Sequence, residues 1–286
     1  MTRDVAITHP ERVLYPATGM TKADVVAYYR TVAHVMVPHL RGRPLMLGRW
    51  PEGVEGRGFG QFECRGRPQW MSHHALRLTD GRVVETCVAD DARSLVWLAN
   101  QGVIELHPYL YRVDAPDRPT AVVFDLDPGA GAGIAACCEV ALLVRERLDA
   151  LGLAAVVKTS GASGLHVFAP ARGATFAETK ALARRIASEL ARDRADRVTE
   201  RIARDARARK VFVDWVQNDE RRQTIAPYSL RAARVPRVST PLSWDEVRAG
   251  ALGARLVFGP DEVLERVRSR GDLFADALEP TQDVPG

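Results

Sequence analysis

Residues 121–129 read AVVFDLDPG, and this stretch decides the fold. The four apolar residues 121–124 predict a buried strand, and Pro-Gly at 128–129 predicts the turn that ends it. A helical pattern follows at 134–151, and AAVVKTSGASGLHVFAP (154–170) then reads as two strands joined by a Gly/Ser loop. Two strands so close in sequence favour an antiparallel hairpin over a doubly wound parallel sheet. We therefore expect an α+β fold with a mixed or antiparallel central sheet flanked by helices.

The sequence on either side of this stretch adds further helices and strands. Thr21 is the expected N-cap of a helix that Asp24 supports near its start and that Pro38 ends. The other expected elements are a strand at 44–50 before a Gly-rich loop at 51–60, a hairpin at 76–85 that turns at Asp80-Gly81, a helix at 90–102, an extended segment at 103–110, a helix at 176–193 and a strand at 210–218. The Arg-rich stretch 192–209 is expected to be a solvated helical face, and the chain after Tyr228 is expected to be rich in loops.

The composition is that of an ordinary globular protein, with 46% hydrophobic and 27% charged residues and a formal net charge of +4. This small positive charge is weak support for a nucleic-acid partner. No apolar run approaches the roughly 18 residues of a membrane span, and MTRDVAITHPERV at the start lacks the apolar region of a signal peptide, so we expect a cytoplasmic protein. The four cysteines, Cys64, Cys87, Cys137 and Cys138, lack metal-binding spacing and are expected to be reduced core residues.

Three aspartates at strand ends carry the strongest chemical signal. Asp125 and Asp127 are two residues apart, so both side chains lie on one face of their strand. Two carboxylates about 7 Å apart repel each other unless a cation lies between them, and a hard divalent metal takes oxygen ligands from both. Asp214 ends a second apolar strand and is followed by the amides Gln217 and Asn218. The three aspartates suit a two-metal site for phosphoryl transfer, whereas the simpler interpretation of the first two is a solvated strand end.

The loop SGASGLH (160–166) is a candidate anion site. Its glycines would let backbone N–H groups converge on an anion, and Ser160 and His166 add side-chain donors, which suits a triphosphate. Taken alone, the histidine could equally be a satisfied core residue. Arg49, in LGRWP, and Arg231, in PYSLRA, are further candidate phosphate ligands.

Motifs across nearly the whole chain resemble one family. FDLDPG, KTSGASGLHVFAP and VFVDWVQNDERRQTIAPYSLRA, in this order and spacing, resemble the polymerase domain of bacterial ligase D, which belongs to the archaeo-eukaryotic primase superfamily. ITHPERVLYPATGMTKADVVAYY, RPLMLGRWPEGVEG and IELHPYL resemble the start of the same domain. The resemblance implies a primase-polymerase fold in a single domain over residues 1–286. Its parts would be a DNA-contacting part at 1–115, a catalytic core at 116–240 and a loop-rich part at 241–286.

The resemblance also implies roles for individual residues. The catalytic and metal-binding residues would be Asp125, Asp127 and Asp214. The incoming nucleotide would be bound by Ser160, His166, His107, Gln217, Arg49 and Arg231. Arg12 and Lys22 would hold the 5′-phosphate of a downstream DNA strand, and Phe59 would stack on the template.

The implied activity is template-directed nucleotide addition by a DNA polymerase or primase, which favours ribonucleotides and fills gaps during non-homologous end joining. It would use two divalent ions, Mn²⁺ or Mg²⁺, because both accept all-oxygen sites. The implied partners are nucleoside triphosphates, DNA with gaps or double-strand breaks, an ATP-dependent DNA ligase and a Ku-type end-bridging protein, with no membrane partner. Such a bacterial protein would act at the nucleoid. None of the four lysines lies in a Lys-x-Asp-Gly adenylation motif, so we do not expect the chain to be a ligase itself.

Two positions depart from the family pattern. Ser163 stands where the family loop usually carries a lysine, and Gly60 follows Phe59 where the family tends to have a second phenylalanine, so template stacking would be weaker or would use Phe62. These departures motivate one alternative, a poorly catalytic DNA-end-binding module of the same fold. A second alternative is a haloacid-dehalogenase-type phosphatase, which also has a strand-terminal Asp-x-Asp but would need Thr or Val in place of Pro128.

Overall fold

The computed structural model describes residues 5–279 and 281–285, and they form the α+β fold that the sequence predicts. The chain packs into two compact units, each made of three separate segments. The first unit comprises Met1–Asp114, Gln223–Ser239 and Phe258–Gly271, and the second comprises Ala115–Arg222, Thr240–Val257 and Asp272–Gly286. Among the described helices, none is long and apolar enough to cross a membrane. The single domain over 1–286 stays a prediction, and its residues 1–4, 280 and 286 lie outside the described part.

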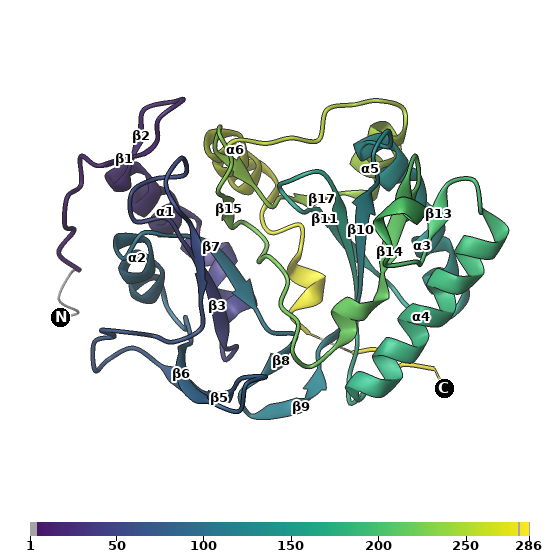
Figure 1. Ribbon diagram of the computed structural model, residues 1–286, viewed down its shortest axis with the longest axis horizontal. Helices are drawn as coiled ribbons and strands as arrows, with labels where there is room; N and C mark the ends of the chain where they lie inside the picture. Colours follow the sequence, from purple (N-terminus) through teal and green to yellow (C-terminus); the bar gives the residue numbers. More distant parts are fainter. Residues whose placement is uncertain (1–4, 280, 286) are drawn as a thin grey trace. The chain divides into compact units, whose positions relative to one another are not determined.

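The first unit combines helices with small antiparallel sheets (Figure 1). Its helices are α1 (Lys22–Leu40), α2 (Ala92–Asn100) and α6 (Pro260–Arg270). Its strands are β1 (Val13–Tyr15), β2 (Met20–Thr21), β3 (Leu45–Arg49), β4 (Phe59–Gln61), β5 (His73–Arg77), β6 (Val83–Cys87), β7 (Val103–Pro108), β8 (Tyr111–Arg112), β15 (Leu230–Arg231) and β16 (Arg237–Val238). The predicted hairpin is confirmed as β5 and β6, and β4, β3 and β7 form a three-stranded sheet in that order.

Helix α1 begins where the sequence predicts. Thr21 and Asp24 form a capping box, in which the Asp24 N–H donates to the Thr21 hydroxyl and the Asp24 carboxylate accepts from the Thr21 N–H. The prediction that Pro38 ends the helix is wrong, because α1 continues to Leu40. Proline removes one N–H donor but lies in the last turn, where the ladder closes with the Arg41 N–H donating to Val37 O. Leu40 is fully buried, so core packing favours this last turn.

Two of the four cysteines correct the prediction of reduced thiols. Cys64 and Cys87 form a disulfide with their Cα atoms 5.0 Å apart. They are 23 residues apart with no spacing motif, and only the fold brings them together. The Cys64 N–H donates to Glu85 O at 2.6 Å, which holds the segment after β4 against β6. Cys137 and Cys138 are free and buried, as predicted.

The second unit is built on a six-stranded sheet in the order β13-β14-β10-β12-β11-β17. Its strands are β9 (Ala115–Pro119), β10 (Ala121–Pro128), β11 (Val156–Thr159), β12 (Leu165–Pro170), β13 (Val198–Thr199), β14 (Val211–Asp214) and β17 (Pro241–Leu242). Its helices are α3 (Ile134–Ala150), α4 (Phe176–Asp193), α5 (Trp244–Ala251) and the 3₁₀ helices η1 (Arg204–Arg207), η2 (Trp215–Asn218) and η3 (Ala275–Ala277). Helices α3 and α4 pack on the sheet beside β10 (Figure 1).

Strand β10 is central in this sheet and antiparallel to both of its neighbours, β12 and β14. The pair β13 and β14 is parallel, so the sheet is mixed, as predicted. The predicted hairpin of 154–170 is confirmed as β11 and β12. A haloacid-dehalogenase-type fold would place its Asp-x-Asp strand among parallel neighbours, so the antiparallel pairing of β10 contradicts that alternative.

One expectation for a less regular segment is wrong. The stretch 192–209 is not one helical face, since α4 ends at Asp193 and is followed by turns, β13 and η1. The loop-rich character expected after Tyr228 stays a prediction; this part contains β15 to β17 and the helices α5 and α6, joined by turns and loops. Ser243 caps α5 by accepting from the Glu246 N–H at 3.2 Å.

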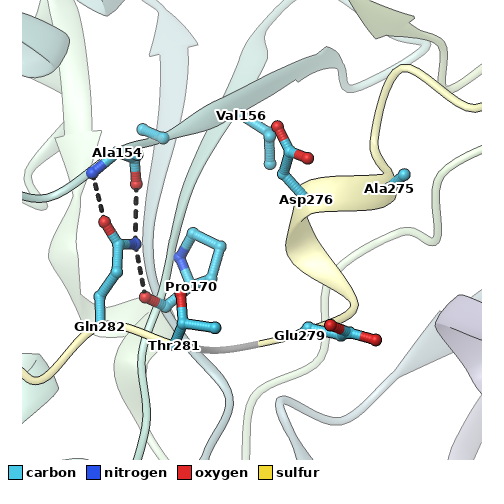
Figure 2. A pocket seen from close by; sticks show the side chains of 9 residues that line it. Ala154, Val156, Pro170, Ala275, Asp276, Glu279, Thr281 and Gln282 are labelled. Carbon is cyan, nitrogen blue, oxygen red and sulfur yellow. Dashed lines mark hydrogen bonds between the residues drawn. The ribbon is translucent and has the colours of Figure 1, made fainter.

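Side chains near the C-terminus fasten this segment to the rest of the second unit. Figure 2 shows the Gln282 amide bonded to the backbone of Ala154 and Pro170. Gln282 Nε2 donates to Ala154 O at 3.1 Å and to Pro170 O at 2.9 Å, and Arg172 pairs with Asp283. These contacts close a hollow of about 400 Å³, lined by Ala154, Ala155, Val156, Pro170, Ala275, Asp276, Glu279, Thr281 and Gln282.

Candidate functional site

Four titratable side chains form a row across the sheet of the second unit. Asp125 on β10 pairs directly with Asp214 on β14 and with His166 on β12, and His166 pairs with Lys158 on β11. Directly paired residues point to the same face of a sheet. Asp127 lies two residues along β10 and shares this face. Alternation along β10 places Asp127 on the face of Asp125, and the strand pairing adds Asp214 and His166 to that face.

The row is acidic at one end and basic at the other. Lys158 Nζ lies 3.0 Å from His166 Nδ1, and both side chains are buried. An ammonium group can only donate, so Nδ1 accepts and the ring proton lies on Nε2. Nε2 in turn lies 3.3 Å from Asp125 Oδ1, and Gln217 Nε2 donates to Asp125 Oδ2 at 3.2 Å. Asp125 is thus the aspartate that faces the basic end.

The three aspartates differ in acidity because their neighbours differ. Burial pushes the pKa of Asp125 upward, but His166, Lys158 and Gln217 outweigh it and hold that pKa below its ordinary value. Burial and the charges of Asp125 and Asp214 raise the pKa of Asp127 to about 6. Burial and Asp125 also raise the pKa of Asp214. The carboxylates repel one another, and a bound cation would relieve this repulsion.

The chemistry of these donors fits a hard divalent metal ion. Asp125 Oδ1 is buried and accepts no hydrogen bond of good geometry from any described residue. Carboxylate oxygens are the ligands that Mg²⁺ and Mn²⁺ prefer. Among residues 5–279 and 281–285, however, no group of three or more His, Cys, Asp or Glu side chains is arranged so that it could hold a metal ion. The ligand set of Asp125, Asp127 and Asp214 therefore stays a prediction.

The loop between β11 and β12 lies against the acidic strand. A Cβ atom at Gly164 would lie 2.2 Å from Leu126 O, so only glycine allows this approach. Ser160 Oγ accepts from the N–H groups of Ala162, at 3.2 Å, and of Gly164, at 3.1 Å. The expectation that the loop directs its N–H groups at an anion is therefore wrong for these two, because the loop's own serine satisfies them. Ser163 is exposed at the corner of the loop.

Gln217 is held beside Asp125 by its neighbour. Asn218 Nδ2 donates to Val123 O at 2.7 Å and Asn218 Oδ1 accepts from the Val123 N–H at 2.8 Å, which pins η2 to β10. Gln217 Oε1 is buried and has no hydrogen-bond partner among the described residues. An amide side chain with a spare acceptor fits a ligand hydroxyl or a water molecule.

Sequence reasoning missed Arg207 in this part of the site. Its charge lowers the pKa of Asp127 and of Asp214, although it is not the main influence on either. Its guanidinium stacks over Phe212 at 3.7 Å from the ring centroid. The only signal in the sequence is the Arg-rich stretch itself, which does not single out one arginine.

In the first unit, Glu105 joins two of the predicted nucleotide-binding residues. His107 Nε2 lies 2.9 Å from Glu105 Oε2, and Arg231 Nε lies 3.4 Å from Glu105 Oε1. His107 lies on β7, and Arg231 lies on β15. Sequence reasoning missed Glu105, because nothing in the IELH motif indicates a partner at residue 231. The structure thus brings His107 and Arg231 together through one buried carboxylate.

Arg49 and Phe59 also lie together in the first unit, on the paired strands β3 and β4. Arg49 donates from Nε to Gln101 O at 3.0 Å and from Nη1 to Gln61 Oε1 at 2.8 Å. Its guanidinium carbon lies 5.6 Å from the centroid of the Phe59 ring. The Phe59 side chain is 44% exposed, so one face of it can accept a stacked base. Gly60 adds no second aromatic ring, and Phe62 is half-buried.

Arg12 and Lys22 lie close to each other in the first unit. Burial lowers the pKa of Lys22, and the charge of Arg12 lowers it further. Lys22 Nζ donates to Thr8 O at 2.6 Å and to Thr8 Oγ1 at 3.0 Å, while Arg12 Nη1 donates to Pro51 O at 2.9 Å. Two neighbouring cations repel each other, and an anion between them would remove this repulsion.

Comparisons with known proteins agree with the predicted resemblance. Residues 21–274 match the family model of the LigD primase-polymerase domain. The multifunctional non-homologous end joining protein LigD of Mycolicibacterium smegmatis is 40% identical over 290 residues, which cover 98% of this chain and 37% of that protein. The multifunctional non-homologous end joining DNA repair protein LigD of Mycobacterium tuberculosis is 40% identical over 296 residues, which cover 98% of this chain and 38% of that protein. The chain thus spans well under half the length of these curated relatives.

A solved structure extends the agreement to the fold. The polymerase domain from Mycobacterium tuberculosis ligase D, in complex with DNA, matches with a TM-score of 0.90 and 38% identity. The match covers 96% of this chain and 98% of that one. The fold and the order of the motifs therefore define a nucleotidyltransferase of the primase-polymerase class. The chain belongs to the LigD primase-polymerase domain family, whose members act in DNA repair and typically use divalent metal ions.

Proposed function

We propose that this chain adds nucleotides, preferentially ribonucleotides, to primer ends at DNA gaps and double-strand breaks during non-homologous end joining. The observation that carries the proposal is the row of Asp214, Asp125 and His166 across three strands, with Asp127 on the same face. The relatives' names support the pathway, and the solved relative is a complex with DNA. An ATP-dependent DNA ligase and a Ku-type end-bridging protein are the proposed partners, in the bacterial cytoplasm at the nucleoid.

In this proposal Asp125, Asp127 and Asp214 hold two divalent ions, Mn²⁺ or Mg²⁺. When bound, such ions would lower the pKa of the primer 3′-hydroxyl and neutralise the departing pyrophosphate. Support comes from burial together with mutual repulsion of the carboxylates, which raise the pKa of Asp127 to about 6 and also raise that of Asp214. His166 Nε2 carries the ring proton at the basic end of the row, where it can donate to a triphosphate oxygen or to Asp125.

The remaining predicted residues bind substrate. By the family resemblance, Ser160, His166, His107, Gln217, Arg49 and Arg231 are proposed to bind the incoming nucleotide. The neighbouring cations Arg12 and Lys22 are proposed to hold the 5′-phosphate of the downstream strand, and this anion would offset their repulsion. Phe59 is proposed to stack on the template, since its ring is partly exposed.

Primer extension by an Asp127→Ala variant tests the metal assignment. The substrate is a gapped duplex with or without a 5′-phosphate, supplied with Mn²⁺ or Mg²⁺ and with ribo- or deoxyribonucleotides. We expect loss of nucleotide addition by at least a hundredfold, because one of three metal-binding carboxylates is gone, while affinity for the gap stays within twofold. Asp117→Asn, at an exposed carboxylate of the same unit, is the matched control. Full activity in Asp127→Ala would remove the two-metal assignment.

The same assay separates this proposal from the end-binding alternative. Ser163 and Gly60 favour that alternative, since each lacks a group that the family pattern supplies. A binding module would show tight, 5′-phosphate-dependent affinity for gapped DNA without product under any metal or nucleotide. Template-dependent addition that needs a divalent metal would exclude it.

A further inference from the structure

Glu105 makes contacts that go beyond an ordinary ion pair. It is 8% exposed and lies two residues before His107 on β7, so both side chains share one face of that strand. Its Oε2 atom is bonded to His107 Nε2. Its Oε1 atom lies near Arg231 Nε and accepts from the Ala232 N–H at 2.9 Å. One buried carboxylate thus orients an imidazole from one segment and a guanidinium from another.

We propose that Glu105 is a positioning residue that holds His107 and Arg231 together in the orientation that binds the triphosphate. The inference rests on the proposed function, in which these two residues bind the incoming nucleotide. Glu105 engages Nε2 of the imidazole and Nε of the guanidinium. The Nδ1 side of the imidazole, and the edge of the guanidinium between its two terminal amino groups, are therefore not the sides that Glu105 engages. Two terminal amino groups are the pair that binds a phosphate in a bidentate manner.

The charge of Glu105 suits this role. Burial raises its pKa, but the bond from His107, the charge of Arg231 and the Ala232 N–H outweigh burial and keep that pKa below its ordinary value. The carboxylate therefore stays ionised at neutral pH. An ionised carboxylate binds a guanidinium and an imidazole N–H more strongly than a neutral amide does.

The backbone around Arg231 is also held by contacts that do not involve Glu105. Tyr15 donates its hydroxyl to Arg231 O at 2.9 Å, and the Leu230 N–H donates to the Tyr29 hydroxyl at 3.1 Å. Replacing the carboxylate by an amide should therefore free the Arg231 side chain and leave β15 in place. This separates a positioning role from a purely structural one.

The test compares nucleotide KM and kcat in primer extension for Glu105→Gln, Glu105→Asp and the wild type. We expect Glu105→Gln to raise the KM for the nucleoside triphosphate roughly tenfold, in line with coupling between contacting charged groups, with kcat within about twofold. Glu105→Asp keeps the charge and should recover part of the affinity. Glu85→Gln is the matched control, since Glu85 forms an exposed pair with His73 at 3.4 Å, and its KM should not change.

A mutant cycle adds a readout that loss of stability would not mimic. In a background that carries both His107→Ala and Arg231→Ala, Glu105→Gln should change KM by less than about twofold, because both groups that it positions are gone. Independent, multiplying effects would overturn the inference, as would an unchanged KM in Glu105→Gln. If Glu105→Gln fails to fold, Glu105→Asp in the same cycle gives the same comparison.

The same data separate failure of this inference from failure of the proposed function. If His107→Ala and Arg231→Ala each raise the KM while Glu105→Gln does not, only the positioning role fails. If neither His107→Ala nor Arg231→Ala changes nucleotide KM, the proposed nucleotide-binding roles fail, and the positioning role fails with them.

Discussion

Ser163 occupies an exposed corner of the loop that lies against the acidic strand β10. The loop holds its own shape, since Ser160 Oγ accepts from the N–H groups of Ala162 and Gly164. A lysine at position 163 would therefore enter a rigid loop and add charge without rebuilding the backbone. A substitution at position 163 therefore tests the effect of the missing charge on nucleotide binding without a change in the loop backbone.

Ser163→Lys should tighten nucleotide binding. An added cation at an exposed position contributes about 1 kcal/mol or less, so we expect the KM for the nucleoside triphosphate to fall several-fold in steady-state primer extension. Ala162→Lys, at the neighbouring exposed position, is the matched control for charge alone. Equal effects of the two lysines would mean that net charge matters and that position 163 has no special geometry.

Sequence reasoning reached the acidic residues because strand alternation alone places Asp125 and Asp127 on one face. It reached Asp214 because that residue also ends an apolar strand, although the direct pairing with Asp125 depends on the sheet register. It could not reach Glu105, whose partner Arg231 lies in a distant segment. Nor could it foresee that Ser160 satisfies its own loop, because that depends on the loop conformation.

At the scale of elements, the helix starts follow from short-range chemistry. Thr21 with Asp24, Thr175 with Glu178 and Ser243 with Glu246 each form a capping box at the start of α1, α4 and α5. Each box satisfies N–H groups that a helix start leaves open. Each box joins residues only three apart, so a helix start of this kind can be predicted without knowledge of the rest of the fold.

Asp24→Asn should remove the pH dependence of the stability that the N-terminal cap of α1 contributes. Hydrogen bonds from the Thr21 N–H and hydroxyl lower the pKa of Asp24 below its ordinary 3.8. A lowered carboxyl pKa adds stability above the unfolded-state pKa, and this stability is lost as the pH falls through the folded-state pKa. We expect the variant to lose about 1 kcal/mol of unfolding free energy near pH 7. The difference should begin to shrink only below about pH 4 and should vanish once the pH is below the lowered folded-state pKa.

Urea unfolding at a series of pH values measures this difference. Glu55→Gln, at an exposed carboxylate in the Gly-rich loop, is the control and should show no such pH-dependent loss. A deficit in Asp24→Asn that persisted unchanged at pH 3 would contradict an electrostatic contribution from this cap.

Elements that depend on tertiary packing were harder to predict. Helix α1 continues beyond Pro38 because Leu40, in its last turn, is buried in the core. The Cys64–Cys87 disulfide depends on the pairing of two segments that carry no spacing signal. In the chain-entropy account, a disulfide that closes a loop of that length stabilises a fold by about 3 kcal/mol. A prediction that lacks this disulfide therefore omits a substantial contribution to stability.

At the scale of the whole molecule, the chain passes repeatedly between the two units. Buried polar groups of the first unit find their hydrogen-bond partners in residues beyond position 222. Tyr28 donates its hydroxyl to Tyr228 O at 2.7 Å, and the Leu106 N–H donates to Ser229 Oγ at 3.0 Å. Both contacts are buried, so a chain without them would leave polar groups without partners.

A fragment that ends at Asp114 should therefore fail to fold cooperatively. Each buried group left without a partner costs about 1–3 kcal/mol, and domains are stable by only about 5–15 kcal/mol. We expect the fragment to show no sharp thermal transition by near-ultraviolet circular dichroism, whereas the full chain does. A cooperative transition in the fragment alone would show that Gln223–Ser239 and Phe258–Gly271 are dispensable for this unit.

This interleaving of segments has a consequence for synthesis on the ribosome. The first unit receives its first segment early but its last one, Phe258–Gly271, only after residues 115–257 have been made. At about 5–20 residues per second, its unfinished core is exposed for roughly 10–30 s after Asp114 is added. A nascent chain that waits this long with apolar surface uncovered is a natural client of ribosome-associated chaperones.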